Sequence, residues 1–442
     1  MGHLAAKSYL DLQKRLEDAA QGAPASEAIF KILEILFTEE EAKLASVLPL
    51  KMFTAREAAK RWNKEEAEAE SILDGLADKA ILIDSEKDGR KIYCLAPTMA
   101  GFFEFSIMRM DGKFDRKILS ELFYQYINVE EDFVREVLGI KPAIARVFVQ
   151  EPALSDENQK LILDYERASA VIKSAATIGV GTCYCRHKME HARHACDMPQ
   201  DVCLTFNSCA DSLVRHGVAK KISVEEALAI LDRVINLGLV QIGDNTREGV
   251  SFICNCCGCC CEAIIACKRL GCYDDFRSNY YAVNNQDACS GCGVCAKRCP
   301  FEAIEIIVGD NGKRVACIDS GKCVGCGVCA RFCPAKSLGL KRHDKLADTP
   351  LNTIERVVLE AINNNKLQNY IFDNYTLWTN RYLRQVLGVI LAQPLAKRIL
   401  VSKQLRSRFF RAVNEKKISN KYNEFYEAGE SIDLEINNKK YD

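Results

Sequence analysis

The sequence predicts an α+β protein in which a central cysteine-rich region lies between two helical regions. Two observations support this prediction. The chain of 442 residues holds 23 cysteines, and Cys94 is the only one outside residues 183–333. On both sides of that segment, apolar residues recur at helical spacing, with one short hairpin pattern near residue 90. A chain of this length is expected to form about two to four domains. We place them at 1–150, 151–278, 279–345 and 346–442.

Residues 1–150 are predicted to be helical and to contain a winged helix. Thr54 and Glu57 have the spacing of a capping box, which starts a short helix, and Asn63 separates it from a second helix running to about Lys79. Two apolar stretches around a polar turn at 88–89 then predict a two-stranded hairpin.

The charge of the second helix argues against DNA as a partner. Helix-turn-helix folds often place that helix against DNA, but here it is acidic and would repel phosphates. Its acidic residues are Glu65, Glu66, Glu68, Glu70, Asp74 and Asp78. We therefore expect a docking or scaffolding role and no nucleic-acid partner.

A helix and a strand are predicted between the two upstream cysteine groups described below. Ser223 and Glu226 form a second capping box, the helix runs to about Leu237, and Gly238 ends it before an apolar strand at 239–242.

Two complete cysteine motifs near the end of the cysteine-rich region are the most specific feature of the chain. Each has three cysteines with two residues between neighbours, then a fourth cysteine after three residues, and then a proline. In bacterial-type ferredoxins the first three cysteines bind one [4Fe–4S] cluster and the fourth binds the other. Zinc knuckles use pairs of cysteines instead of such triple runs. The predicted ligand sets are Cys289, Cys292, Cys295 and Cys333 for one cluster, and Cys323, Cys326, Cys329 and Cys299 for the second.

The two motifs repeat with an offset of 34 residues, from Cys289 to Cys323. This repeat predicts the internal pseudo-twofold symmetry of a ferredoxin-like fold, in which each half gives short strands and a helix. Glycines at 291, 293, 325 and 327 are expected to let the backbone approach the clusters.

A first upstream group consists of Cys183, Cys185, Cys196 and Cys203. Four thiolates can satisfy one four-coordinate site. We expect an additional [4Fe–4S] cluster there, with structural zinc as the alternative.

A second upstream group places six thiols within eight residues, and a reducing environment argues against disulfides. One cubane needs four ligands, so this segment either serves one cluster with spare thiols or ligates two centres, and Cys267 and Cys272 could complete such a set. Its Cys-Cys-Gly tripeptide is similar to that of heterodisulfide-reductase-type proteins, which carry a catalytic noncubane cluster but repeat the tripeptide at different spacing. The six residues are Cys254, Cys256, Cys257, Cys259, Cys260 and Cys261.

Together, these segments resemble a family of multi-cluster 4Fe–4S dicluster-domain proteins from anaerobic bacteria and archaea. The likeness rests on the Cys183-to-Arg186 segment, on Cys196 through Leu204, on Ile253 through Cys257, and on the two ferredoxin motifs. The resemblance implies an electron-transfer component of a larger redox system, with protein partners as electron donor and acceptor. It names no substrate.

Charge and hydropathy constrain the location. Lysine and arginine together number 60, as do aspartate and glutamate, so no global field recruits nucleic acid or membrane. We expect no signal peptide and no membrane-spanning helix, and hence a cytoplasmic protein. A basic amphipathic pattern at 397–413 allows peripheral contact with an anionic membrane or an acidic partner, or ordinary packing on the protein's own core.

The sequence therefore predicts an electron-transfer iron–sulfur protein that relays electrons between a low-potential donor and an acceptor enzyme. No glycine-rich nucleotide fingerprint is present, so hydride chemistry is expected on a partner. Two alternatives remain: a reductase with a substrate-binding cluster near Cys254–Cys261, and a redox-sensing winged-helix regulator.

Overall fold

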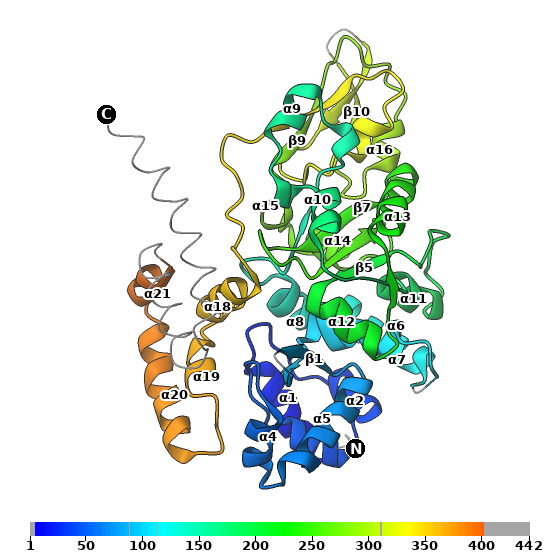
Figure 1. The fold of residues 1–442 in the computed structure, drawn as a ribbon. Helices are drawn as coiled ribbons and strands as arrows, with labels where there is room; N and C mark the ends of the chain where they lie inside the picture. Colours follow the sequence, from blue (N-terminus) through cyan, green and yellow to red (C-terminus); the bar gives the residue numbers. More distant parts are fainter. Residues whose placement is uncertain (1–4, 88, 113, 310–311, 402–442) are drawn as a thin grey trace, which may run out of the picture.

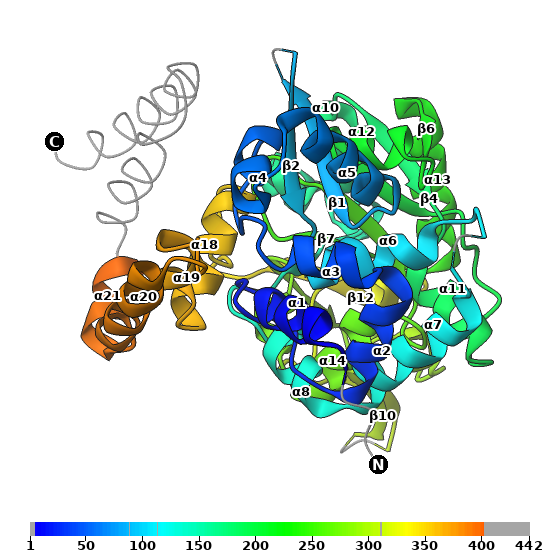
Figure 2. The same cartoon turned by 90° about the horizontal axis from the view of Figure 1, so that it is seen from below.

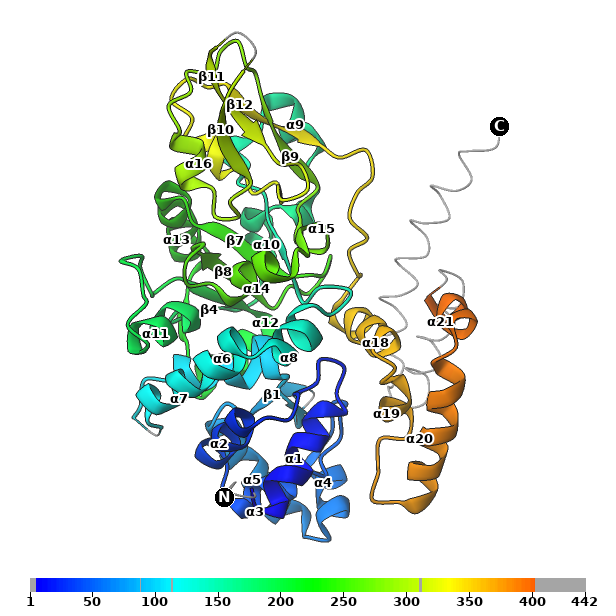
Figure 3. The same cartoon turned by 180° about the vertical axis from the view of Figure 1, so that it is seen from behind.

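The computed structural model describes residues 5–87, 89–112, 114–309 and 312–401 (Figure 1). In Figure 1 the N-terminal helices lie at the bottom, the largest sheet in the middle and the paired cysteine motifs at the top, while the C-terminal helices stand to one side. Figure 3 shows the same order from behind.

The N-terminal part is a group of helices followed by a hairpin. The helices are α1 (Lys7–Glu17), α2 (Glu27–Leu36), α3 (Glu39–Ala45), α4 (Ala55–Trp62) and α5 (Glu66–Asp78), and the hairpin strands are β1 (Leu82–Lys87) and β2 (Arg90–Leu95). Thr54 and Glu57 make both hydrogen bonds of a capping box, and Asn63 ends α4 in the left-handed conformation with φ 53°. The predicted pair of helices and the predicted hairpin are confirmed.

Further short helices complete the apolar core of this part and lead into the sheet. They are α6 (Phe103–Met108), α7 (Arg116–Phe123) and α8 (Glu131–Phe133), with helical turns at Thr98–Phe102, Tyr124–Val129 and Val134–Leu138. Tyr184, Leu213 and Val218, from the following region, belong to the same buried core. The N-terminal helices are thus packed directly against the cysteine-rich region.

The middle layer is a six-stranded antiparallel sheet in the order β3-β7-β8-β5-β4-β6. Its strands are β3 (Ala145–Val147), β4 (Ile178–Gly181), β5 (Cys203–Phe206), β6 (Lys220–Ile222), β7 (Val240–Asp244) and β8 (Phe252–Cys256). Helices α10 (Ala168–Ser174) and α13 (Val224–Leu237) share one buried core with residues of this sheet. The predicted capping box of Ser223 with Glu226, and the end of α13 at Gly238, are confirmed.

Strand alternation directs the cysteines of β8 to the opposite face. Ile253 is buried in the core with α10 and α13, so Cys254 and Cys256 point to the other side of the sheet. On that side, Cys256 shares a buried core with α14 (Glu262–Leu270) and α15 (Tyr273–Phe276), and the first turn of α11 (Tyr184–His191) lines a cavity together with Cys254 and Cys256. Helices α9 (Asp156–Leu161) and α12 (Asn207–Arg215) complete the region.

The paired motifs form two small antiparallel sheets. Strand β9 (Tyr280–Asn284) pairs with β12 (Leu338–Arg342), and β10 (Ile304–Val308) pairs with β11 (Arg314–Ile318). Helices α16 (Val294–Arg298) and α17 (Val328–Arg331) begin after equivalent left-handed glycines, Gly293 with φ 80° and Gly327 with φ 88°. Each half therefore supplies strands and a helix, as the repeat predicted.

The C-terminal helices return to the N-terminal part. They are α18 (Thr353–Asn363), α19 (Leu367–Ile371), α20 (Trp378–Leu391) and α21 (Pro394–Val401), and Figure 2 shows α20 and α21 standing apart from the main body. Asp373, just after α19, forms ion pairs with Arg15 and Arg61. The predicted basic helix at 397–413 lies within α21 up to residue 401, and its remainder is outside the described residues. Within the described ranges, no helix has the length and apolar character needed to span a membrane.

Candidate metal centres

Two cavities in the region of the paired motifs are each lined by four cysteines. The first has about 280 Å³ of space free of protein atoms and the second about 340 Å³. Cys289, Cys292, Cys295 and Cys333 line the first, and Cys299, Cys323, Cys326 and Cys329 line the second. The structure thus brings together the two sets that the motifs predicted, including the exchange of the fourth cysteine between the halves.

Glycines make room for these cavities. Gly291 and Gly325 have φ values of +67° and +69°, which residues with a side chain rarely adopt. A Cβ atom at Gly291 would lie 2.4 Å from the carbonyl oxygen of Arg314, and one at Gly325 would lie 1.9 Å from that of Tyr280. The loops that carry the cysteines are therefore packed on neighbouring backbone in a way that only glycine permits.

Backbone N–H groups also point at the sulfur atoms. The N–H of Ala282 donates to Sγ of Cys323 at 3.4 Å, and that of Ala303 donates to Sγ of Cys299 at 3.3 Å. Such bonds stabilise negative charge on thiolates, which is the form that binds metal. Four thiols and glycine-lined space fit a [4Fe–4S] cluster in each cavity, and the two N–H donors belong to the second cavity.

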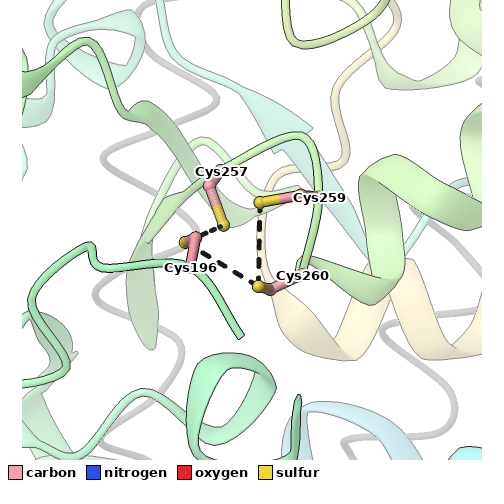
Figure 4. A group of neighbouring side chains, drawn as sticks. All are labelled: Cys196, Cys257, Cys259 and Cys260. Atoms are coloured by element: carbon pink, nitrogen blue, oxygen red, sulfur yellow. Dashed lines mark hydrogen bonds between the residues drawn. The ribbon is translucent and has the colours of Figure 1, made fainter. Parts of the chain in front are cut away.

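A separate group of four thiols lies where the loop after α11 meets the turn between β8 and α14 (Figure 4). Sγ of Cys196 is 3.6 Å from that of Cys257 and 3.8 Å from that of Cys260, while Cys259 and Cys260 are 3.7 Å apart. A hydrogen bond from Cys260 is the main cause that lowers the pKa of Cys257, to about 4. The arrangement is a compact tetrad suited to a cation.

A third set of thiols lines a cavity of about 1310 Å³ that is partly open to solvent. The pKa of Cys254 is lowered chiefly by the neighbouring thiol of Cys203, and that of Cys261 chiefly by the neighbouring thiol of Cys185. The cavity is lined by six of the predicted cysteines, which we call the six-thiol group: Cys183, Cys185, Cys203, Cys254, Cys256 and Cys261.

This grouping differs from the one that the sequence predicted. The spacing placed Cys196 with Cys183, Cys185 and Cys203, but Cys196 lies with the tetrad. The second upstream group is divided as well, because Cys254, Cys256 and Cys261 line the cavity, whereas Cys257, Cys259 and Cys260 lie in the tetrad. Which thiols share a site is thus decided by the pairing of β5 with β8, which joins residues about fifty positions apart.

Further residues line the cavity of the six-thiol group, and the sequence suggested only some of them. Cys267 and Cys272 line it, as the sequence suggested, and so does Cys209. Glu104, from the N-terminal part, lines it too, and burial raises the pKa of this carboxyl to about 8. Nothing in the sequence around residue 104 signals this placement.

Buried charges surround the same region. Lys188 and Glu262 form a fully buried ion pair, and the hydroxyl of Tyr184 donates to Glu262 at 3.1 Å. The guanidinium of Arg186 donates to the carbonyl oxygen of Asn255 at 3.0 Å and to Sγ of Cys257 at 3.8 Å. Arg186 therefore places a positive charge next to a thiol of the tetrad.

Comparison with known families supports the assignment of the two four-cysteine cavities. Residues 287–337 match the 4Fe-4S dicluster domain. No curated protein and no solved structure matches the chain significantly. The protein is therefore an iron–sulfur protein that binds [4Fe–4S] clusters through a ferredoxin-like domain, and the upstream regions have no match that assigns them a role.

Proposed function

We propose that this protein is an electron-transfer component that relays electrons from a low-potential donor to an acceptor enzyme. The observation that carries the proposal is the pair of four-cysteine cavities within the matched domain. In each cavity the cysteines would hold one [4Fe–4S] cluster, which takes up and releases single electrons. The chain's own contribution is to supply the thiolates, exclude water and donate N–H groups to the sulfur atoms.

The six-thiol group is proposed to hold an additional iron–sulfur centre. Six thiols converge on one cavity, and four are enough for a cubane. Cys256 and Cys261 are buried, and a reducing environment keeps such thiols available as ligands. The number of clusters in the chain is therefore at least three under this proposal.

A continuous apolar core connects this cavity with the ferredoxin-like domain. Phe301 lines the cavity of Cys299 and Cys326, Phe276 lines the cavity of the six-thiol group, and the two ring centroids are 6.3 Å apart. Cys326 belongs to the same buried cluster as Cys256, Cys261 and Cys267. Electrons would pass between the two centres through packed side chains instead of water.

The N-terminal part is proposed to dock a protein partner. Its second helix and hairpin have the order of a winged helix, and Glu65, Glu66, Glu68 and Asp78 are exposed. This acidic surface suits a basic protein surface better than a phosphate backbone, which favours docking over the redox-sensing regulator. We expect action in a reducing compartment such as the cytoplasm, with any peripheral membrane contact through 397–413.

A second candidate function is favoured by the shape of the cavity of the six-thiol group. Beyond the thiols, part of its wall is apolar and includes Met99, Phe105, Met108 and Ile140, which leaves space next to the six-thiol group. A small apolar electron acceptor bound there would be reduced at that centre. In a carbon monoxide titration of the reduced protein, a change in the EPR signal of the centre would indicate an open coordination site and favour this reductase.

Metal analysis of anaerobically purified protein tests the main proposal. Two cubanes account for about eight irons, so we expect a higher iron and sulfide content in the wild type. Cys292→Ser should alter the EPR signal of one ferredoxin cluster, and Cys256→Ala should remove the iron and sulfide beyond eight. Cys317→Ser, at an exposed cysteine that lines neither ferredoxin cavity nor the cavity of the six-thiol group, is the matched control. About eight irons in both the wild type and Cys256→Ala would refute the additional centre.

A further inference from the structure

The tetrad of Cys196, Cys257, Cys259 and Cys260 differs in size from the other cysteine sites. All four Sγ atoms lie within 4.8 Å of one another, and the three hydrogen-bonded pairs are 3.6 to 3.8 Å apart (Figure 4). Among the residues that the structure describes, no other group of three or more potential metal-binding side chains is this compact. The ferredoxin cysteines, although they line common cavities, are therefore spaced more widely.

This spacing matches a single tetrahedral ion. A Zn–S bond is about 2.3 Å long, so the edge of a tetrahedron of four thiolates around one zinc is about 3.8 Å. A cubane cluster must place four irons and four sulfides between its thiolates and holds them much farther apart. The ferredoxin sites of the same chain, with their open cavities, provide the internal comparison.

The surroundings of the tetrad suit the charge of such a site. Four thiolates around one divalent cation leave a net charge of about minus two, which needs compensation when buried. The side chain of Arg186 is 1% exposed, and its guanidinium donates to Sγ of Cys257 at 3.8 Å. The same guanidinium is fixed by the carbonyl oxygen of Asn255, so it acts as an outer-shell group that orients a ligand.

The tetrad also lies at a structural junction. It ties the loop after α11 to the turn at Gly258, and this turn packs on the ferredoxin-like domain. A Cβ atom at Gly258 would lie 2.7 Å from the carbonyl oxygen of Pro300, the residue after Cys299. Lys268 donates to the carbonyl oxygen of Gly258 at 3.3 Å and pairs with Glu302 at 2.6 Å.

We propose that Cys196, Cys257, Cys259 and Cys260 bind one zinc ion. The site is structural: all four positions are filled by thiolates, and zinc exchanges no electrons. It joins the loop after α11 to the turn between β8 and α14, and so fixes the shape of the turn that packs on the ferredoxin-like domain at Pro300. The proposal is independent of the proposed electron relay, because it concerns thiols that line neither ferredoxin cavity.

The test compares the metal content of full-length protein purified anaerobically from cells grown with both iron and zinc. The wild type and Cys317→Ser should hold about one zinc per chain with four sulfur ligands at about 2.3 Å in zinc X-ray absorption. Cys196→Ser should lose that zinc and keep its sulfide. The proposal would be overturned if Cys196→Ser lost sulfide and several irons without any zinc, or if the tetrad held a single iron.

A second measurement covers the case in which Cys196→Ser does not fold. Wild-type protein produced with cobalt in place of zinc should show the visible bands of tetrahedral cobalt with thiolate ligands. Absence of those bands, together with a wild type that contains no zinc, would overturn the proposal. An iron content that shows empty ferredoxin sites would instead contradict the proposed function and leave the zinc result unaffected.

Discussion

Replacing Gly325 by alanine tests whether the close approach of backbone to the cysteine loops is needed to hold a cluster. Gly325 lies between Cys323 and Cys326 and has φ +69°, where a side chain costs about 1–2 kcal/mol. The new Cβ would also lie 1.9 Å from the carbonyl oxygen of Tyr280. Relief of such an overlap requires a backbone shift, which costs about 1–3 kcal/mol more. We therefore expect Gly325→Ala to destabilise the protein by about 2–5 kcal/mol.

Gly217→Ala is the matched control, because Gly217 has the same φ of +69° and a Cβ added there would meet no atom within 4 Å. Gly217→Ala should lower the free energy of unfolding only by the conformational cost of a side chain at this φ, about 1–2 kcal/mol. The assay is anaerobic denaturant unfolding followed by the visible iron–sulfur absorbance, together with the iron content of the purified variants. Equal unfolding midpoints and equal iron contents in Gly325→Ala and Gly217→Ala would show that the contact with Tyr280 affects neither stability nor cluster binding.

Two further predictions concern electron flow and pH. Phe276→Leu keeps the apolar packing but removes one of the two rings between the cavities, so freeze-quench EPR should show slower electron exchange at unchanged iron content; an unchanged rate would exclude this route. Hydrogen bonds that the imidazole of His216 donates to the carboxylates of Asp84 and then Asp78 raise the pKa of His216. Its stabilising contribution is complete below about pH 6.5 and is lost as pH rises through the raised value. The difference in unfolding midpoint between wild type and His216→Gln should therefore shrink as the pH rises above about 6.5, and a constant difference would contradict the assignment.

The sequence predicted elements whose signals are local. The capping boxes of Thr54 and Ser223 start their helices within a few residues of the signal, and both were confirmed. The three-residue strand β3 was not predicted, because it is too short to show alternation and exists through its pairing with β7, about a hundred residues later. Local patterns contain no information about such a partner.

The candidate sites show the same difference between local sequence signals and contacts made between distant residues. The ferredoxin cysteines could be sorted into two sets because a fixed motif spacing encodes a fixed loop geometry. The upstream cysteines could be recognised as ligands but not sorted, since Cys196 meets Cys257 and Cys260 only through the order of strands in the sheet. Glu104 reaches the cavity of the six-thiol group through packing of the N-terminal helices, which no cysteine spacing could reveal.

The ion pairs of Asp373 have a consequence for how the chain is made. Arg15 is fully buried, and its carboxylate partner is supplied from a position 358 residues later. A buried charge without its partner costs about 3–5 kcal/mol. While the polypeptide leaves the ribosome, the helix that carries Arg15 therefore lacks the carboxylate that neutralises this arginine until residue 373 has been synthesised. The N-terminal helices reach their final stability only after the cysteine-rich segments have emerged. The contact between Arg15 and Asp373 therefore forms when the segments that hold the metal sites are already outside the ribosome.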